Sequence, residues 1–371
     1  MACPCTIDRP GRGERVAVGT SQVTLGIPQL VSGGVMLTWR CTNECRHCLY
    51  RCSPRMPDEW MTLEMAGRIL KALGREPRLD AVHIAGGEPT LNLKLLEEVI
   101  RLAVETGVRV SYVETNASGA TDPDETREAF DRLRRAGLRA VLVSVSPFHN
   151  EFVPFRNTRV CIEAAADVFG PGGAIVYTPP MHEMLSRMPD DGRHTVEEFA
   201  RWAGLEEKLA DIPRMYGVIP GGRAPEALRE CYTPRPAEEF EGKSCLRDLT
   251  STTHFHVDDR GLLFTGMCAG IVAATVDDFH PDMSGEQHVV FRKLCEEGPY
   301  GLMQVASRGF GYGPREDGYV SRCDLCFDVR RHLHARGKFE ELRPDAFYTT
   351  VSRSEERAAG RRRRGFDETG D

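Results

Sequence analysis

Between about residue 35 and residue 220, the chain alternates short apolar β-type runs with amphipathic helical runs. This pitch predicts a parallel sheet with right-handed crossovers. Six β–α units are too few for a closed eight-stranded barrel. We therefore expect an α/β fold, a partial (β/α)6 TIM-type barrel, with functional groups at the carboxyl ends of the strands. Strands are expected at 35–40, 80–85, 109–114, 139–145, 174–177 and 215–219, and helices at 62–73, 93–105, 123–136, 158–168 and 195–209.

The pattern changes after about residue 224. A stretch rich in Pro and Glu reads as a linker, and the runs 253–257 and 262–265 flank a turn and predict a hairpin. Short helices are expected near 286–295, 300–307 and 327–335, followed by a poorly ordered tail that carries the basic run Arg361–Arg364. The expected parts are an extension (1–34), the barrel (35–224), the linker (225–244), a small cysteine-rich α+β domain (245–340) and a polar tail (341–371).

Thirteen cysteines are the unusual part of the composition. No apolar run reaches the ~20 residues that span a membrane, and the N-terminus lacks the pattern of a secretory signal. A cytoplasmic protein is therefore expected, and there clustered cysteines bind metal or do chemistry more often than they form disulfides. The net charge of −7 does not favour a nucleic-acid-binding surface.

Three of these cysteines, Cys41, Cys45 and Cys48, lie in one loop directly after the first expected strand. An iron–sulfur cube takes thiolate ligands at its corners, so three cysteines can hold one 4Fe–4S cluster and leave its fourth iron open to a small molecule. Buried free thiols are one alternative. A zinc site completed by His47 or Cys52 is another.

The Cys-x3-Cys-x2-Cys spacing resembles the signature of the radical S-adenosylmethionine (SAM) superfamily. The resemblance implies that SAM chelates the open iron. It also implies that an electron from the cluster cleaves SAM to methionine and a 5′-deoxyadenosyl radical, which takes hydrogen from a substrate. An electron donor such as flavodoxin or ferredoxin is then an expected partner.

Further motifs stand where this resemblance requires them. Gly86-Gly87-Glu88-Pro89 follows the second expected strand and is similar to the motif that holds the SAM amino group. By the same resemblance, Asn116, Ser144 and Ser146 contact the SAM ribose or carboxylate, and a segment with Ile219 and Gly221 lies near the adenine. Helix caps and turns are the alternative reading of these polar residues and glycines.

A second cysteine set comprises Cys245, Cys268, Cys323 and Cys326, and four thiolates can complete every corner of a cube. The arrangement resembles the Twitch domain, the shorter relative of the SPASM domain, and implies one auxiliary 4Fe–4S cluster. No cysteine follows Cys326, so the two-cluster pattern is incomplete. Zinc is the alternative occupant.

His149 and Glu151 follow the fourth expected strand and are candidate catalytic residues that orient substrate or exchange a proton. Packed residues at the start of a helix are the alternative. Only about 34 residues precede the first strand, which is short for a leader-recognition domain and slightly favours a small-molecule substrate over a peptide or protein. A non-catalytic iron–sulfur electron carrier or a zinc-stabilised binding module is the competing class.

Overall fold

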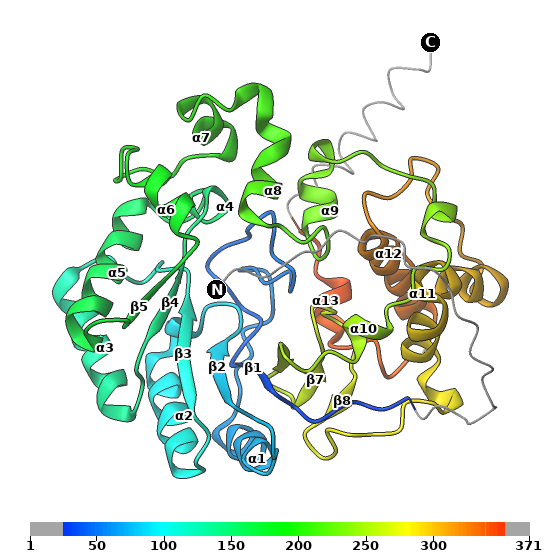
Figure 1. Ribbon diagram of the computed structural model, residues 1–371, viewed down its shortest axis with the longest axis horizontal. Helices are drawn as coiled ribbons and strands as arrows, with labels where there is room; N and C mark the ends of the chain where they lie inside the picture. The colour runs from blue at the N-terminus through cyan, green and yellow to red at the C-terminus, as the bar shows by residue number, and fades with distance from the viewer. Residues whose placement is uncertain (1–24, 338, 353–371) are drawn as a thin grey trace, which may run out of the picture.

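One mixed sheet of eight strands organises the chain (Figure 1). The computed structural model describes residues 25–337 and 339–352. The strand order is β5-β4-β3-β2-β1-β6-β7-β8, with parallel pairing from β5 to β6 and antiparallel pairing for β7 and β8. The strands are β1 (Ser32–Met36), β2 (Ala81–Ala85), β3 (Val110–Thr115), β4 (Val141–Ser144), β5 (Ala174–Tyr177), β6 (Phe255–Val257), β7 (Leu262–Phe264) and β8 (Ala274–Thr275). The open parallel sheet and its crossover helices confirm the partial barrel predicted from the sequence.

Crossover helices cover the outer face of the parallel strands, in the left half of Figure 1. Thr62 caps α1 by accepting from Met65 N, and Asp122 caps α3 by accepting from Asp124 N and Glu125 N. These caps satisfy backbone donors that a helix start leaves unpaired. The helices of the barrel half are α1 (Leu63–Leu73), α2 (Leu93–Glu105), α3 (Pro123–Ala136), α4 (Pro147–Asn150), α5 (Phe155–Phe169), α6 (Pro179–Leu185), α7 (Val196–Trp202) and α8 (Ile212–Tyr216).

The prediction of a sixth strand at 215–219 is wrong. Met215 and Tyr216 are the last residues of α8, which has Pro213 in its first turn and is stopped by Gly217 at φ 80°, and residues 218–219 form no strand. The sixth parallel strand is instead β6, which pairs with β1 at the opposite side of the barrel strands. A strand at 215–219 would have had to extend the sheet beyond β5, where the described chain forms helices.

The predicted hairpin is present as β6 and β7, with His256 opposite Phe264. Because β6 pairs with β1, the sheet continues from the barrel into the C-terminal part, and the division at residues 225–244 stays a prediction. The C-terminal helices fill the right half of Figure 1 and are α9 (Ala224–Ala227), α10 (Leu246–Leu249), α11 (Val289–Phe310), α12 (Arg322–Arg336) and α13 (Asp345–Thr349).

Two expectations for this part need correction. The helices expected at 286–295 and 300–307 form the single element α11, kinked at Gly298 (φ 72°). The poorly ordered tail does not begin at 341, because Leu342, Phe347 and Tyr348 are buried and α13 packs on the body of the protein. Apolar side chains in a mostly polar stretch were the signal that the sequence prediction overlooked. Cys3, Cys5 and Arg361–Arg364 lie outside the described residues.

No helix in the described part of the chain is both long enough and apolar enough to cross a membrane.

Candidate active site

The loop with Cys41, Cys45 and Cys48 follows β1 and borders a cavity of about 390 Å³, a volume typical of small-molecule sites. All three side chains line this cavity. Cys41 and Cys45 are buried, and Cys48 is partly exposed. The three thiols therefore border one cavity, and their role as cluster ligands stays a prediction.

A buried arginine that the sequence analysis did not single out fixes this loop. Arg223 is 2% exposed, and its guanidinium donates to the carbonyls of Cys45 (2.7 Å), Arg51 (2.6 Å) and Cys52 (2.9 Å). Its own backbone N–H donates to Cys48 O (3.1 Å). A guanidinium presents several donors in a rigid fork, so one side chain can hold three carbonyls of an irregular loop.

The thiols of the loop have different acidities. Burial raises the pKa of Cys41 to about 12, with a further contribution from the charge of Glu88, and burial also raises the pKa of Cys45. A hydrogen bond from Cys52 lowers the pKa of Cys48 to about 6 against the effect of burial. Buried thiols ionise only with a compensating cation nearby, so metal binding here would release protons.

Gly86 and Gly87 bring the end of β2 against the strand exit that leads to Cys41. A Cβ on Gly87 would lie 1.7 Å from Arg40 O, and Gly86 has φ 139°. The Gly87 and Glu88 amides donate to Thr38 O (2.7 Å) and Arg40 O (3.0 Å). Only glycine allows this approach, so the motif sets the position of the cysteine loop while its glycines also line the cavity.

Glu88 does not point a free carboxylate into the cavity. The side chain is fully buried and accepts from Thr90 Oγ1 (2.6 Å), Thr115 Oγ1 (2.8 Å) and Asn116 N (2.7 Å). Burial raises the pKa of the carboxyl, and these hydrogen bonds oppose the shift. Glu88 therefore ties the ends of β2 and β3 together.

Asn116 links β3 to the cysteine loop. Its amide donates to Cys41 Sγ (3.4 Å) and to Thr42 Oγ1 (2.9 Å). Asn116 also lines the cavity, so it contacts both the sulfur of Cys41 and the cavity itself. The residues from the sequence prediction that line the cavity are Cys41, Cys45, Cys48, Gly86, Gly87, Pro89, Asn116, Ser144, His149 and Ile219.

Outside the second cysteine set, four predicted site residues do not line this cavity: Glu88, Ser146, Glu151 and Gly221. Ser146 caps α4, accepting from His149 N, and its hydroxyl contacts His149 Nδ1 at 2.7 Å. Glu151 instead pairs with Arg46 of the cysteine loop (2.7 Å). Gly221 borders the second cysteine set. Ser146 and Glu151 thus follow the cap and packing alternatives.

His149 does reach the cavity, where its ring lies 4.9 Å from that of His47 and 6.4 Å from that of Tyr216. Burial lowers the pKa of His149 to about 4, and burial also lowers the pKa of His47. Both rings are therefore neutral near pH 7 and can exchange hydrogen bonds with an uncharged ligand.

A histidine group on the sheet was missed by the sequence analysis. His83 on β2 and His256 on β6 are both in register with Gly34 on β1, and their Nε2 atoms lie 3.2 Å apart above that glycine. His256 Nδ1 contacts Tyr50 OH at 2.8 Å. A Cβ on Gly34 would lie 2.6 Å from His83, so glycine makes this meeting possible. No sequence signal revealed it, because the pairing of β1 with β6 is a long-range event.

This histidine group borders the cavity through its neighbours. The His254 ring lies 5.6 Å from that of His83, and Glu114 Oε1 lies 3.6 Å from His83 Nε2. Glu114, His254 and Tyr112 line the cavity. Burial raises the pKa of Glu114 to about 7, aided by the charge of Glu88. The cavity floor thus offers a carboxyl that changes protonation near neutral pH, beside neutral imidazoles.

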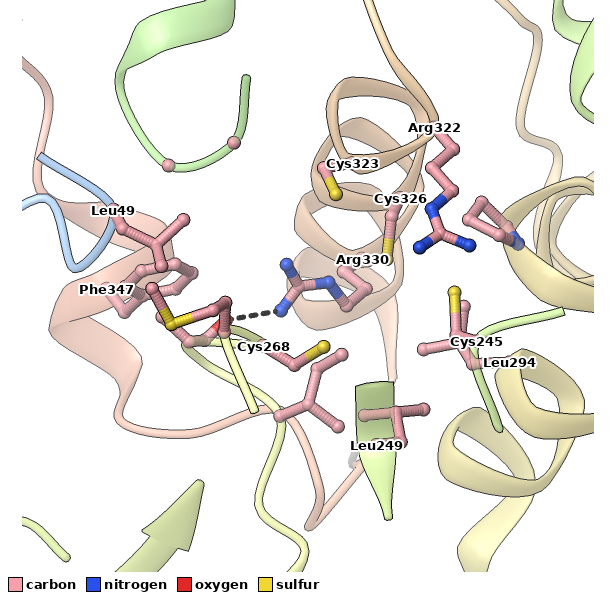
Figure 2. A pocket seen from close by; sticks show the side chains of 16 residues that line it. Leu49, Cys245, Leu249, Cys268, Leu294, Arg322, Cys323, Cys326, Arg330 and Phe347 are labelled. Carbon is pink, nitrogen blue, oxygen red and sulfur yellow. Dashed lines mark hydrogen bonds between the residues drawn. The ribbon is translucent and has the colours of Figure 1, made fainter. Parts of the chain in front are cut away.

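The second cysteine set surrounds a separate, mostly apolar pocket (Figure 2). Cys323 and Cys326 lie on the first turns of α12, Cys268 follows β7, and Cys245 precedes α10. Phe347 of α13 closes one side. All four predicted cysteines line this one pocket, which is the convergence that the sequence prediction requires.

Within the described residues, no three His, Cys, Asp or Glu side chains converge as tightly as a single metal ion requires. A four-iron cube is larger than one ion, and its thiolates stand correspondingly further apart. The donor chemistry of both sets, thiols around a cavity, suits iron–sulfur clusters.

Comparison with known proteins agrees with the site. The sequence model described as the radical SAM superfamily matches residues 35–169, which include the cysteine loop, Gly86–Pro89 and Asn116. Residues of this chain are 34% identical over 90 positions to the putative protein YfkA of Bacillus subtilis (strain 168), a match that spans 23% of this chain and 23% of that relative.

Two solved structures show a distant likeness. BtrN in complex with AdoMet and 2-DOIA has 15% identity and a TM-score of 0.40, covering 73% of this chain and 89% of BtrN. Native anSMEcpe with bound AdoMet has 14% identity and a TM-score of 0.42, covering 90% of this chain and 97% of anSMEcpe. The residues that match the radical SAM superfamily model, 35–169, carry the cysteine loop and the glycine motif around one cavity, so this part of the chain is similar to the radical SAM superfamily.

Proposed function

We propose that Cys41, Cys45 and Cys48 hold a 4Fe–4S cluster, that SAM binds in the adjoining cavity, and that the enzyme abstracts hydrogen from a small polar molecule. The observation that carries the proposal is the shared lining of one cavity by the three cysteines, the glycine motif and Asn116. When bound, the cluster supplies the electron that cleaves SAM to methionine and a 5′-deoxyadenosyl radical. The cytoplasm is the proposed location, with a flavodoxin or ferredoxin as electron donor.

Several residues of the chain then have distinct tasks. Arg223 holds the loop carbonyls so that the three thiols keep their spacing. Asn116 donates to the sulfur of Cys41, which favours its anionic, ligating form. Gly86 and Gly87 line the cavity, where their backbone carbonyls can accept from the SAM amino group. Ser144 also lines the cavity and is a proposed contact for the polar end of SAM, and Ile219 is a proposed contact for its adenine.

The cavity lining favours a substrate without an anionic group. Among the described residues of this lining, Glu114 is the one Asp, Glu, Lys or Arg, and the histidines are neutral. Binding of phosphate or carboxylate generally uses Arg or Lys. Glu114, His149 and His254 suit hydroxyl or amino groups, which they can hydrogen-bond. We therefore propose a neutral or cationic small molecule with hydroxyl or amino groups.

The second cysteine set supports an auxiliary cluster. We propose that Cys245, Cys268, Cys323 and Cys326 ligate a further 4Fe–4S cluster in a Twitch-type or SPASM-type domain at residues 245–340, joined by residues 225–244 to the radical SAM domain at 35–224. Convergence of all four side chains on one pocket is the support for this ligand set. Zinc in the same pocket is the competing occupant.

Anaerobic reconstitution tests the function. Protein loaded with iron and sulfide, reduced and mixed with SAM should release 5′-deoxyadenosine, whereas Cys41→Ala/Cys45→Ala/Cys48→Ala should release none. Iron analysis should give about eight irons per chain in the wild type and about four in the triple variant. A wild-type protein that carries a reducible cluster but neither binds SAM nor cleaves it would refute the proposal. Co-purification of a tightly bound precursor peptide would overturn the small-molecule assignment.

A further inference from the structure

Arg330 shares one helix face with two of the auxiliary cysteines. Cys323, Cys326 and Arg330 stand at positions i, i+3 and i+7 of α12, a spacing that places side chains along one side of a helix. Figure 2 shows the guanidinium of Arg330 reaching into the pocket between Cys268 and Cys326. Arg330 is 6% exposed, so its charge is removed from bulk water.

The hydrogen bonds of Arg330 hold it without neutralising it. Nη1 donates to Ala269 O (3.0 Å) and to Tyr348 OH (2.7 Å), and the Tyr348 hydroxyl donates in turn to Gly270 O. These partners are uncharged and lie directly after Cys268 or on α13. The Nε–H of Arg330 is buried and has no partner in the described structure. The Nε–H group can therefore still donate a hydrogen bond.

The positive charge also lacks a carboxylate. Within residues 25–337 and 339–352, no Asp or Glu forms an ion pair with Arg330, whereas Arg322 at the same pocket pairs with Asp248 (2.8 Å). A guanidinium does not deprotonate in proteins, and a buried, unpaired charge is strongly destabilising. The groups near Arg330 that can become anionic are the Tyr348 phenol, whose pKa burial raises, and two thiols of the cysteine set, Cys326 and Cys268.

We propose that Arg330 is the counter-ion of the auxiliary cluster and raises its reduction potential. This inference rests on the proposed ligation of that cluster by the four cysteines. Four thiolates give an iron–sulfur cluster net negative charge, and reduction adds one more electron. A fixed cation beside the sulfurs stabilises the reduced form more than the oxidised form, and cluster potentials follow net charge and hydrogen bonds to sulfur.

The test is a redox titration of the reconstituted holoenzyme, followed by electron paramagnetic resonance. Cys41→Ala/Cys45→Ala/Cys48→Ala serves as background, so that the auxiliary cluster is the cluster observed. In this background Arg330→Met should shift the midpoint potential to more negative values. Arg330→Lys should shift it less, because the charge remains. Arg331→Gln, a change at an exposed neighbour on α12, should leave the potential unchanged.

The outcomes separate the two proposals. If the background protein holds about four irons per chain and Arg330→Met leaves the midpoint potential unchanged, the counter-ion role alone is overturned. No iron in that background, or zinc in its place, would overturn the auxiliary cluster itself. If Arg330→Met does not fold, Arg330→Gln is measured instead, since its neutral amide can still donate to Ala269 O. The same negative shift is then expected.

Discussion

Replacing Arg223 with methionine removes the only side chain that bonds three carbonyls of the cysteine loop in the described structure. A hydrogen bond from a charged donor contributes about 1.5–3 kcal/mol. The three bonds share one donor group and do not add independently. Methionine fills most of the space but leaves buried carbonyls unpaired. We expect a loss of about 3–5 kcal/mol, the range for breaking a buried charged network.

Urea unfolding of the iron-free protein under reducing conditions measures this loss. With a urea dependence of about 3 kcal/mol per molar or more, the midpoint should fall by roughly 1 M. Arg109→Met, at an exposed pair with Asp80, is the matched control and should change stability by less than about 1 kcal/mol. Arg223→Lys should resemble the methionine variant, because one ammonium cannot reach three carbonyls.

Iron loading gives the second measurement on Arg223. A loosened loop should also load less iron at Cys41, Cys45 and Cys48 than the wild type does under identical reconstitution. An Arg223→Met protein as stable as the control, with full iron content and SAM cleavage, would show that the loop keeps its shape without this side chain and that our reasoning is wrong.

Other changes test separate contacts. Gly87→Ala should prevent cluster loading, since its Cβ would meet Arg40 O at 1.7 Å. The control is Gly67→Ala in α1, where a Cβ has nothing within 4 Å, and this variant should be more stable than the wild type by up to about 1 kcal/mol. Iron analysis measures the loading and thermal unfolding the stability, and a Gly87→Ala protein with full iron content would contradict the prediction. Asn116→Ala should slow 5′-deoxyadenosine release about tenfold by removing the donor to Cys41 Sγ; an unchanged rate would exclude that contribution. Glu114→Gln tests the pH dependence of stability. Because the pKa of Glu114 is raised to about 7 in the folded protein, its ionisation destabilises the fold as pH rises from about 4.5 to 7. The advantage of Glu114→Gln in urea midpoint should therefore grow between pH 5 and pH 8, and a constant difference would refute the burial argument. Cys52→Ala should keep the wild-type iron content, because the Cys52 thiol donates to Tyr50 O and Gly86 O and is not a proposed ligand; loss of four irons would show that Cys52 is a ligand.

Helices and strands whose ends are marked by neighbouring residues were predicted correctly from the sequence. The helices α2 and α3 and the strand β5 have the expected bounds, since caps, glycines and apolar periodicity mark them within a few residues. The cysteine loop and the glycine motif were found for the same reason: their spacing is local. The wrong strand at 215–219 shows the limit, because an apolar run becomes a strand only if a sheet edge is available to it.

Residues of the site that act across long distances in sequence were harder to predict. Arg223 bonds to carbonyls 171 to 178 positions away, and His256 meets His83 only because β6 pairs with β1. Glu151 looked catalytic from its position after a strand, yet Arg46 of the cysteine loop takes its carboxylate. Arginines recur in these failures, since their long side chains reach partners that no spacing rule encodes.

The segment at residues 220–223 gives the two cysteine sets a common support. Ser321, which caps α12, donates to Pro220 O (2.5 Å), and a Cβ on Gly221 would lie 3.4 Å from Cys323 Cβ. On the other side, a Cβ on Gly222 would lie 2.5 Å from Cys48 O, and Arg223 follows immediately. Leu49 and Met267 line both cavities. Ligation at either set therefore restrains backbone that also shapes the other. Loading one cluster should make the second easier to load, a coupling that the order of iron uptake in the two sets of cysteine variants would reveal.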